Sequence, residues 1–264
     1  MAKKETRGIA VVTGATGAIG QLYAEGLAER GYTLLLSAKS REPLEELSES
    51  ITRKTGQKVE VSPADLADHN ALHDFCARLA ADRDISLLAN IAGPAVFCPF
   101  TTISSGQIDT TIAVNVSAMT HLCRSVVEGF VARGRGTIVN FASMLAFRPW
   151  AEFNVHSASK AFAVALSQSL QAQLRHKGIL VQVVTPTACA RQFWENAGFP
   201  FDYLPPDAVM NRDDFVAAVL RALDLKEEWV FPSLDDPVTW TQFEATRIRL
   251  VQGMMHNVPA SRYR

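Results

Sequence analysis

Three side chains with acid–base capacity lie close together in the segment 140–160. Ser143 follows an apolar run typical of a buried strand, and His156 and Lys160 are four residues apart in a helix expected over 152–176. Residues four apart share one face of a helix, so the imidazole and the ammonium point the same way. A hydroxyl, an imidazole and an ammonium that converge in this manner are suited to proton transfer to or from a substrate oxygen.

A glycine-rich turn near the N-terminus is suited to binding phosphate. The apolar run 9–12 is followed by the segment TGATGAIG and by a helical pattern that ends at Gly31. Glycines let the backbone turn sharply and approach a pyrophosphate, and a helix N-terminus offers N–H groups and a positive dipole end. The order strand, turn, helix predicts cofactor contacts at Gly14, Thr16, Gly17, Ile19 and Gly20.

Together the two segments resemble the short-chain dehydrogenase/reductase family, in which a strand-end Ser precedes Tyr-x-x-x-Lys and a T-G-x-x-x-G-x-G loop binds the cofactor. His156 stands at the position of the family's Tyr, with the family's spacing to both Ser143 and Lys160. In the loop, Ala18 takes the central glycine position and Gly17 lies one place earlier. The resemblance covers roughly residues 8–232.

The resemblance implies a catalytic set of four residues: Ser143, His156, Lys160 and Asn115. In the family the Asn holds a water that extends the proton path from the Lys. The family also grips the nicotinamide through Pro-Gly and a Thr five residues past the Pro, whereas this chain has Thr187 and Arg191 there. This is a second departure from the family pattern near the reactive end.

NADP(H) is predicted in preference to NAD(H). No acidic residue follows the expected strand 33–37, where a free ribose 2′-hydroxyl would be bound, and Lys39 can pair with a 2′-phosphate instead. The alternative is that Lys39 is a solvated charge before the helix expected over 43–52. By resemblance, the contacts outside the glycine-rich turn are Lys39, Asp65, Leu66, Asn90, Ala92, Gly93, Lys160, Pro186 and Cys189.

Strand and helix patterns alternate about seven times, which predicts one Rossmann-type α/β domain, a doubly wound parallel sheet with helices on both faces. The whole chain, 1–264, is expected to form this single domain, with a substrate lid at about 188–210 and a helical tail at about 238–258. The expected strands are 9–12, 33–37, 58–61, 85–93, 137–142, 179–184 and 229–232. The remaining expected helices are 70–81, 107–133 and 211–225, the last with Asn211 as its N-cap.

The segment 193–204 is rich in aromatic residues and shows little helical or strand periodicity, so it is expected to be a loop. A long loop here usually acts as a lid, which predicts a bulky, apolar small-molecule substrate. The alternative is that these aromatic side chains belong to the core or to a subunit interface.

Composition excludes several classes of protein. The 26 basic and 27 acidic residues are nearly balanced and form no basic stripe, so no nucleic-acid partner is expected. The four cysteines show no disulfide or zinc spacing, and no signal sequence or membrane span is visible, which favours a cytoplasmic protein without a metal or membrane partner. The resemblance implies a homodimer or homotetramer through the helices 107–133 and 152–176.

Three hypotheses for function follow from His156. Beside Lys160 its imidazole is expected to be neutral near neutral pH, and a neutral ring can still take part in proton transfer or polarise a carbonyl. The favoured hypothesis is a reductase or dehydrogenase in which His156 replaces the Tyr. The alternatives are a non-redox isomerase, cyclase or lyase on the same scaffold, and a catalytically silent NADP(H)-binding protein.

Overall fold

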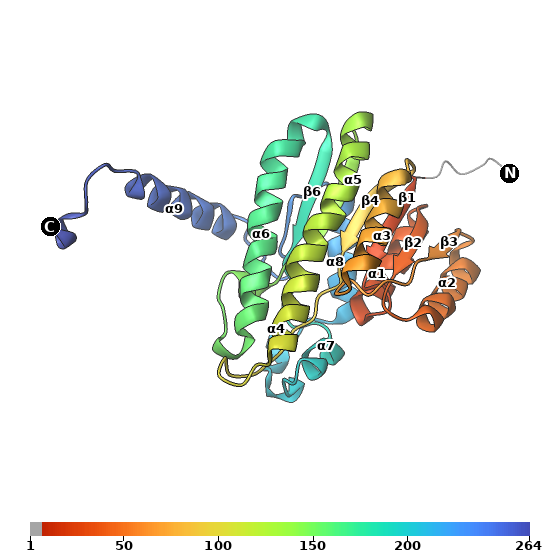
Figure 1. Cartoon of the computed structure of the whole chain (residues 1–264), viewed down its shortest axis with the longest axis horizontal. Helices are drawn as coiled ribbons and strands as arrows, with labels where there is room; N and C mark the ends of the chain where they lie inside the picture. Colours follow the sequence, from red (N-terminus) through yellow and green to blue (C-terminus); the bar gives the residue numbers. More distant parts are fainter. Residues whose placement is uncertain (1–6) are drawn as a thin grey trace. The chain divides into compact units, whose positions relative to one another are not determined.

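The computed structural model of the protein describes residues 7–264, which divide into two compact units, one ending at Pro232 and the other comprising Ser233–Arg264. The first unit is built on a seven-stranded parallel sheet with the order β3-β2-β1-β4-β5-β6-β7. Figure 1 labels five of these strands, β3, β2, β1, β4 and β6, from right to left. The predicted parallel sheet is therefore confirmed. Its strands are β1 (Ile9–Thr13), β2 (Thr33–Ser37), β3 (Val59–Val61), β4 (Ile85–Asn90), β5 (Gly136–Phe141), β6 (Ile179–Val184) and β7 (Trp229–Val230).

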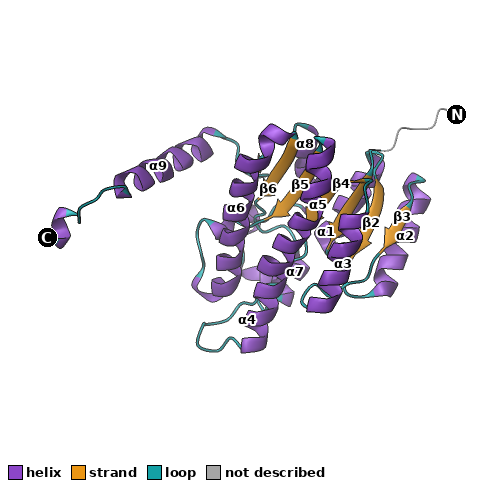
Figure 2. Ribbon diagram, turned by 45° about the horizontal axis from the view of Figure 1, so that its top comes forward, coloured by secondary structure: helices purple, strands orange, loops and turns teal. Residues whose placement is uncertain are grey.

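The central strands are apolar on both faces because helices cover both sides of the sheet (Figure 2). Alternate residues of a strand point to opposite faces. In β1, Ala10 and Val12 accordingly pack into one core and Val11 into the other. The first core includes α1 (Ala18–Glu29), α2 (Arg41–Thr55) and α8 (Arg212–Asp224), and the second includes α3 (His69–Ala81), α5 (Met119–Arg133) and α6 (Asn154–Leu174).

The strand order reverses at β1, which pairs with β2 on one side and with β4 on the other. In such sheets a crevice opens beyond the carboxyl ends of the strands on either side of the reversal, and ligands bind there. The glycine-rich turn follows β1, and the segment 91–93 follows β4. Both segments therefore lie at the place where the topology provides a binding site.

The helix expected over 107–133 is present and runs without a gap over 105–133, but its middle is π-helical, which the sequence analysis did not predict. The structure has α4 (Ser105–Ile112), a π-helical segment (Ala113–Ala118) and then α5. Asn115 lies in the π-helical segment, and its side chain bonds to a loop and to α6, which gives a physical reason for the local widening. Such π segments occur frequently at functional sites.

The segment expected to lack regular structure contains a short helix, α7 (Arg191–Asn196), and a 3-10 turn (Phe201–Tyr203). The prediction of an irregular loop was wrong in this respect. Within α7 the Arg191 guanidinium pairs with Glu195 one turn later, at 3.2 Å, and such pairs support short helices. Trp194 is buried and anchors the helix.

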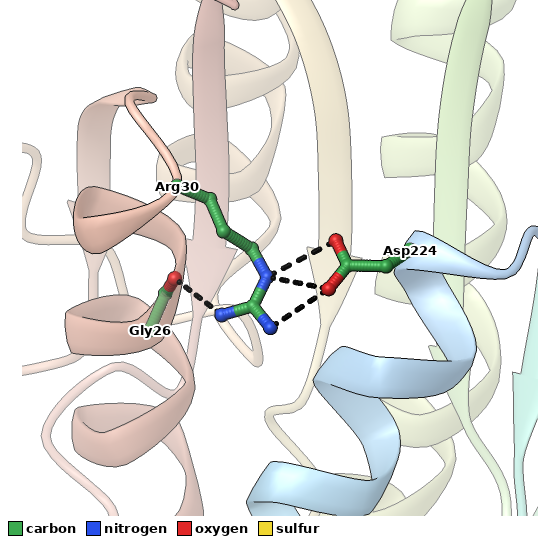
Figure 3. Close-up of polar contacts among 3 residues, drawn as sticks. All are labelled: Gly26, Arg30 and Asp224. Carbon is green, nitrogen blue, oxygen red and sulfur yellow. Dashed lines mark hydrogen bonds and ion pairs between the residues drawn. The ribbon is translucent and has the colours of Figure 1, made fainter.

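A bidentate ion pair joins the end of α1 to the end of α8 (Figure 3). The Arg30 guanidinium donates to both carboxylate oxygens of Asp224, at 2.9 to 3.2 Å, and to the carbonyl oxygen of Gly26 at 3.0 Å. The hydrogen bonds from Arg30 outweigh the effect of partial burial and lower the pKa of Asp224. The pair therefore holds together two helices on one face of the sheet.

Replacing Asp224 by Ala is expected to lower the free energy of unfolding by about 1 kcal/mol near neutral pH, because a fixed bidentate pair is worth more than a mobile one. Since the folded-state pKa of Asp224 is lowered, this contribution is present above the unfolded-state pKa and disappears as the pH falls through the folded-state pKa. Urea unfolding at several pH values measures it. The control is Glu128→Ala, which breaks the more exposed Arg124 pair; equal losses in both variants would contradict the prediction.

The second unit consists mainly of α9 (Val238–Met254), in the segment for which a helical tail was predicted. No side chain of this helix is buried, and its exposed apolar residues include Ile248, Leu250 and Met254. Within the described residues 7–264, no helix combines the length and the apolar character needed to cross a bilayer.

Candidate active site

One cavity of about 730 Å³ connects the glycine-rich turn to the segment 140–160. This volume is within the range of sites for small molecules and cofactors. Of the predicted site residues, Asn90 and Asn115 are absent from its lining. The predicted residues that line it are Gly14, Thr16, Gly17, Ile19, Gly20, Lys39, Asp65, Leu66, Ala92, Gly93, Ser143, His156, Lys160, Pro186 and Cys189.

The glycine-rich turn has the shape of a phosphate cradle. Gly14 has a φ of +65°, and a Cβ there would lie 2.8 Å from the backbone of Ala92. A Cβ on Gly20 would lie 2.2 Å from the carbonyl oxygen of Gly14. No side chain caps the N-terminus of α1, where Gly17 is the N-cap residue, so its N–H groups suit an anion. The turn therefore fits a pyrophosphate.

In the loop after β2, Lys39 forms an ion pair with Asp65, which follows β3, at 3.0 Å. The sequence analysis missed this interaction. Partial burial alone would raise the pKa of Asp65, but the N–H of Ala67 and the Lys39 ammonium outweigh it and lower that pKa. Both side chains line the cavity, and Lys39 is 65% exposed. Lys39 is thus held at the cavity by a carboxylate and stays accessible to a ligand phosphate.

Lys160 is buried deep at the reactive end. Its Nζ donates to the carbonyl oxygen of Phe141 at 2.8 Å, at the end of β5. Burial lowers the pKa of Lys160 to about 8. A Cβ on Gly93 would lie 3.0 Å from this Nζ and 3.1 Å from Oδ1 of Asn115, so glycine leaves a small space between the two polar groups.

Asn115 lies behind the wall of the cavity and connects three segments. Its Nδ2 donates to the carbonyl oxygen of Pro94 at 3.1 Å and to Oγ of Ser159 at 2.9 Å. Its Oδ1 is buried without a hydrogen-bond partner among the described residues, which suits a bound water near Lys160.

Asn90, in β4, donates from its side-chain amide to Oδ1 of Asn140, in β5, at 2.8 Å. It therefore connects two neighbouring strands and does not line the cavity.

His156 is 3% exposed and is fixed by a hydrogen bond and by two aromatic rings. Its Nδ1 lies 3.1 Å from the carbonyl oxygen of Pro94, and its ring packs against Phe153 and Phe193. Burial, and then the Lys160 ammonium, lower the pKa of His156 to about 3, against the opposing effect of the Pro94 bond. The imidazole is therefore neutral at physiological pH, as expected from the sequence.

Ser143 follows β5 and begins a 3-10 turn (Met144–Ala146). Its Oγ accepts the backbone N–H of Leu145 at 3.1 Å. The hydroxyl hydrogen has no acceptor among the described residues, so it can be donated to a ligand oxygen in the cavity. The site thus combines a hydroxyl donor, a neutral imidazole and a buried amine.

Arg191 does not line the cavity, although the sequence analysis counted it as a departure at the reactive end. Its guanidinium pairs with Asp202 at 2.8 Å and lies over the ring of Phe201 at 4.5 Å. It therefore fastens α7 to the following turn. The cavity wall at this place is formed by Phe193 and Trp194.

The aromatic residues of the segment 193–204 serve both roles considered from the sequence, as core and as cavity wall. Trp194 and Phe199 pack with Phe97, Trp150 and Phe153 in a small third core. The sequence analysis named none of these three partners, because aromatic residues in distant segments carry no spacing signal. The short helix α7 is thus a packed cover over the reactive end.

The parallel sheet has a phosphate cradle at its strand reversal, and acid–base groups lie at the far end of the same cavity. This arrangement is typical of dinucleotide-binding α/β proteins. The chain matches the family described as short chain dehydrogenase over residues 8–198. It therefore belongs to the short-chain dehydrogenase family, whose members are oxidoreductases acting on alcohol and ketone groups.

Two solved structures are similar to this chain over nearly its whole length. A short-chain dehydrogenase from Sphingobium yanoikuyae in complex with NADPH has a TM-score of 0.93 and 34% identity, covering 97% of this chain and 100% of its own. The bulky-bulky ketone specific alcohol dehydrogenase from Comamonas testosteroni has a TM-score of 0.89 and 31% identity, covering 98% and 99%. Mouse (Mus musculus) 17-beta-hydroxysteroid dehydrogenase type 3 is 30% identical over 83% of this chain and 70% of its own length.

Proposed function

We propose that this protein is an NADP(H)-dependent oxidoreductase that interconverts a ketone and a secondary alcohol of a bulky, apolar small molecule. The observation that carries the proposal is the single cavity that joins the phosphate cradle to Ser143, His156 and Lys160. When bound, NADP(H) supplies or accepts the hydride. In this proposal the Ser143 hydroxyl donates a hydrogen bond to the substrate oxygen. His156 takes the place of the family's Tyr, and Lys160 lies beside these two residues.

The preference for NADP(H) over NAD(H) rests on Lys39. It follows the end of β2, lines the cavity and is held there by Asp65. A 2′-phosphate would form an ion pair with its ammonium, whereas a free 2′-hydroxyl carries no charge and could gain only a weaker hydrogen bond. The Sphingobium structure, with NADPH bound, also supports this preference.

Replacing Lys39 by Ala is expected to weaken NADPH binding about tenfold and to leave NADH binding unchanged, because the exposed ammonium contributes one screened contact with the phosphate. Fluorescence titration of both reduced cofactors measures the two affinities. The control is Lys58→Ala, which removes an equal charge from a side chain that pairs with Glu60 outside the cavity. Equal weakening of NADPH and NADH by Lys39→Ala would contradict the preference.

A bulky, apolar substrate is supported by the cover of the reactive end. Phe193, Trp194 and Leu145 present apolar surface to the cavity beside His156. Hydrophobic and aromatic side chains with a few polar groups are the usual lining of sites for apolar molecules. The names of the Comamonas and mouse relatives, a bulky-bulky ketone specific enzyme and a hydroxysteroid dehydrogenase, agree with this substrate class.

The experiment that tests the proposal follows the nicotinamide absorbance with one ketone and its alcohol, benzophenone with NADPH and benzhydrol with NADP⁺. Turnover in either direction that is lost in Ser143→Ala and in His156→Phe supports the proposal. The matched control His176→Phe makes the same substitution in an exposed turn and should keep full activity. No change in absorbance with either pair, while NADPH still binds, would reject it.

A catalytically silent NADP(H)-binding protein is the second candidate, and the state of His156 favours it. With a pKa lowered to about 3, the imidazole is a poor base, and its single ring hydrogen is engaged with Pro94. Under this candidate the protein binds cofactor and ligand without hydride transfer. The same absorbance experiment distinguishes the two, because a silent protein gives binding without turnover.

A further inference from the structure

The hydrogen bond at His156 determines which ring nitrogen carries the hydrogen. Nδ1 lies 3.1 Å from the carbonyl oxygen of Pro94, and a carbonyl oxygen can only accept. A neutral imidazole has one N–H, so that hydrogen belongs to Nδ1. The other tautomer would place two lone pairs against each other, at Nδ1 and at the oxygen of Pro94.

The acceptor that fixes this tautomer is itself held in place. The carbonyl oxygen of Pro94 also accepts Nδ2 of Asn115 at 3.1 Å, and the same Nδ2 donates to Ser159 at 2.9 Å. Ser159 in turn donates to the backbone oxygen of His156 at 2.7 Å. The ring, the loop after β4 and the π-helical segment thus form one connected network, and buried networks of this kind specify a single arrangement.

The second ring nitrogen of His156 is consequently a hydrogen-bond acceptor. No group of the described residues bonds to Nε2, and the ring lines the cavity. Ser143 lines the same cavity with a hydroxyl hydrogen to donate. Beside the Lys160 amine, the reactive end therefore offers a hydroxyl donor at Ser143 and an acceptor at His156.

We propose that the reactive end of the cavity recognises the secondary-alcohol form of its ligand in preference to the ketone, with Nε2 of His156 as acceptor and Ser143 as donor. The identity of the ligand class rests on the proposed function. An alcohol oxygen can accept from Ser143 and donate to Nε2 at once, whereas a ketone oxygen can only accept and must face the lone pair of Nε2. In this respect Pro94 and Asn115 are positioning residues, since they act on the ligand through His156.

The tautomer can be observed directly, without any ligand or turnover. Two-bond proton–nitrogen correlation spectra of nitrogen-labelled protein distinguish the two tautomers of a neutral histidine, and the His156 signal is assigned by its loss in His156→Phe. We expect the Nδ1–H tautomer in the protein near neutral pH. A predominant Nε2–H tautomer, or rapid exchange between the two, would overturn the inference whatever the protein's activity.

Selectivity for the alcohol is measured by calorimetry with benzhydrol and benzophenone, each added to protein saturated with tetrahydro-NADP, an analogue that transfers no hydride. We expect the alcohol to bind about tenfold more tightly, because the ketone leaves a buried acceptor unpaired. In His156→Phe the ratio of the two dissociation constants, benzophenone over benzhydrol, should fall to about one, since residue 156 no longer offers an acceptor. His176→Phe, with the same substitution outside the cavity, should keep the full ratio.

The outcomes separate this inference from the function on which it rests. Equal or tighter binding of the ketone to the unmodified protein overturns the alcohol preference, even when turnover of either compound shows that the proposed function is correct. Binding of neither compound overturns both the preference and the proposed substrate class. A tenfold preference that depends on His156 supports the inference even in a protein that shows no change in nicotinamide absorbance.

Discussion

Replacing His156 by Tyr raises the rate of ketone reduction by about 10²-fold or more under the proposed function, because a positioned proton donor contributes about 10² to 10⁴ in rate. The imidazole has its hydrogen on Nδ1, bonded to Pro94, and presents only a lone pair at Nε2. A phenol at this position carries a hydrogen that it can donate. The buried Lys160 ammonium that disfavours a charged imidazole would also lower the pKa of the phenol.

The surroundings of His156 accommodate the loss of its hydrogen bond. The carbonyl oxygen of Pro94 keeps its bond from Asn115, at 3.1 Å, so no buried acceptor is left unpaired. The nearest aromatic neighbour on the cavity side is Phe193, whose ring centroid lies 5.7 Å from that of the imidazole. Phe193 belongs to the short helix α7, which is held by the Arg191–Asp202 ion pair and by the buried Trp194.

The matched control for His156→Tyr is His156→Phe, which has the same ring size without the hydroxyl. Initial rates of NADPH oxidation with benzophenone, together with NADPH affinity and thermal unfolding, are measured for both variants. Only the Tyr variant should gain activity. A Tyr variant that folds, binds NADPH normally and is no faster than the unmodified protein would show that proton donation by residue 156 does not limit the reaction.

The sheet and the phosphate-binding turn could be predicted from the sequence because their signals are local. The apolar runs that became β1, β2 and β6 are bounded by turns and helices, and buried parallel strands need such runs. Gly14 and Gly20 are required where backbone segments nearly touch. Gly20 meets Gly14 within the turn itself, whereas Gly14 meets Ala92 after β4, so the second requirement depends on the tertiary fold.

The partners inside the site could not be predicted in the same way. The oxygen that orients His156 belongs to Pro94, 62 residues earlier in the chain, and a backbone carbonyl is present in every residue and leaves no mark on the sequence. The pairing of Lys39 with Asp65 and the outward turn of Arg191 also depend on tertiary packing. Sequence spacing placed Ser143, His156 and Lys160 in one cavity, whereas their hydrogen-bond partners required the structure.

Replacing Gly20 by Ala is expected to weaken NADPH binding about 10²-fold, because it disturbs the cradle through which backbone N–H groups hold the pyrophosphate. The new Cβ would lie 2.2 Å from the carbonyl oxygen of Gly14 and 2.9 Å from Cα of Ala15. Both neighbours are backbone atoms of the turn, so they cannot rotate away as a side chain does. The start of α1 must move relative to the turn, and the N–H groups at its N-terminus move with it.

A graded series of glycine substitutions makes this prediction specific. A Cβ on Gly17 would lie 3.3 Å from the oxygen of Gly14, which a small shift relieves, so Gly17→Ala should weaken binding much less. A Cβ on Gly106, in α4, meets nothing within 4 Å, so Gly106→Ala should bind NADPH as the unmodified protein does. Fluorescence titration gives the affinities, and thermal unfolding shows that each variant is folded. If Gly20→Ala binds NADPH as tightly as Gly106→Ala, the turn does not hold the pyrophosphate, and the cofactor assignment of this cavity fails with it.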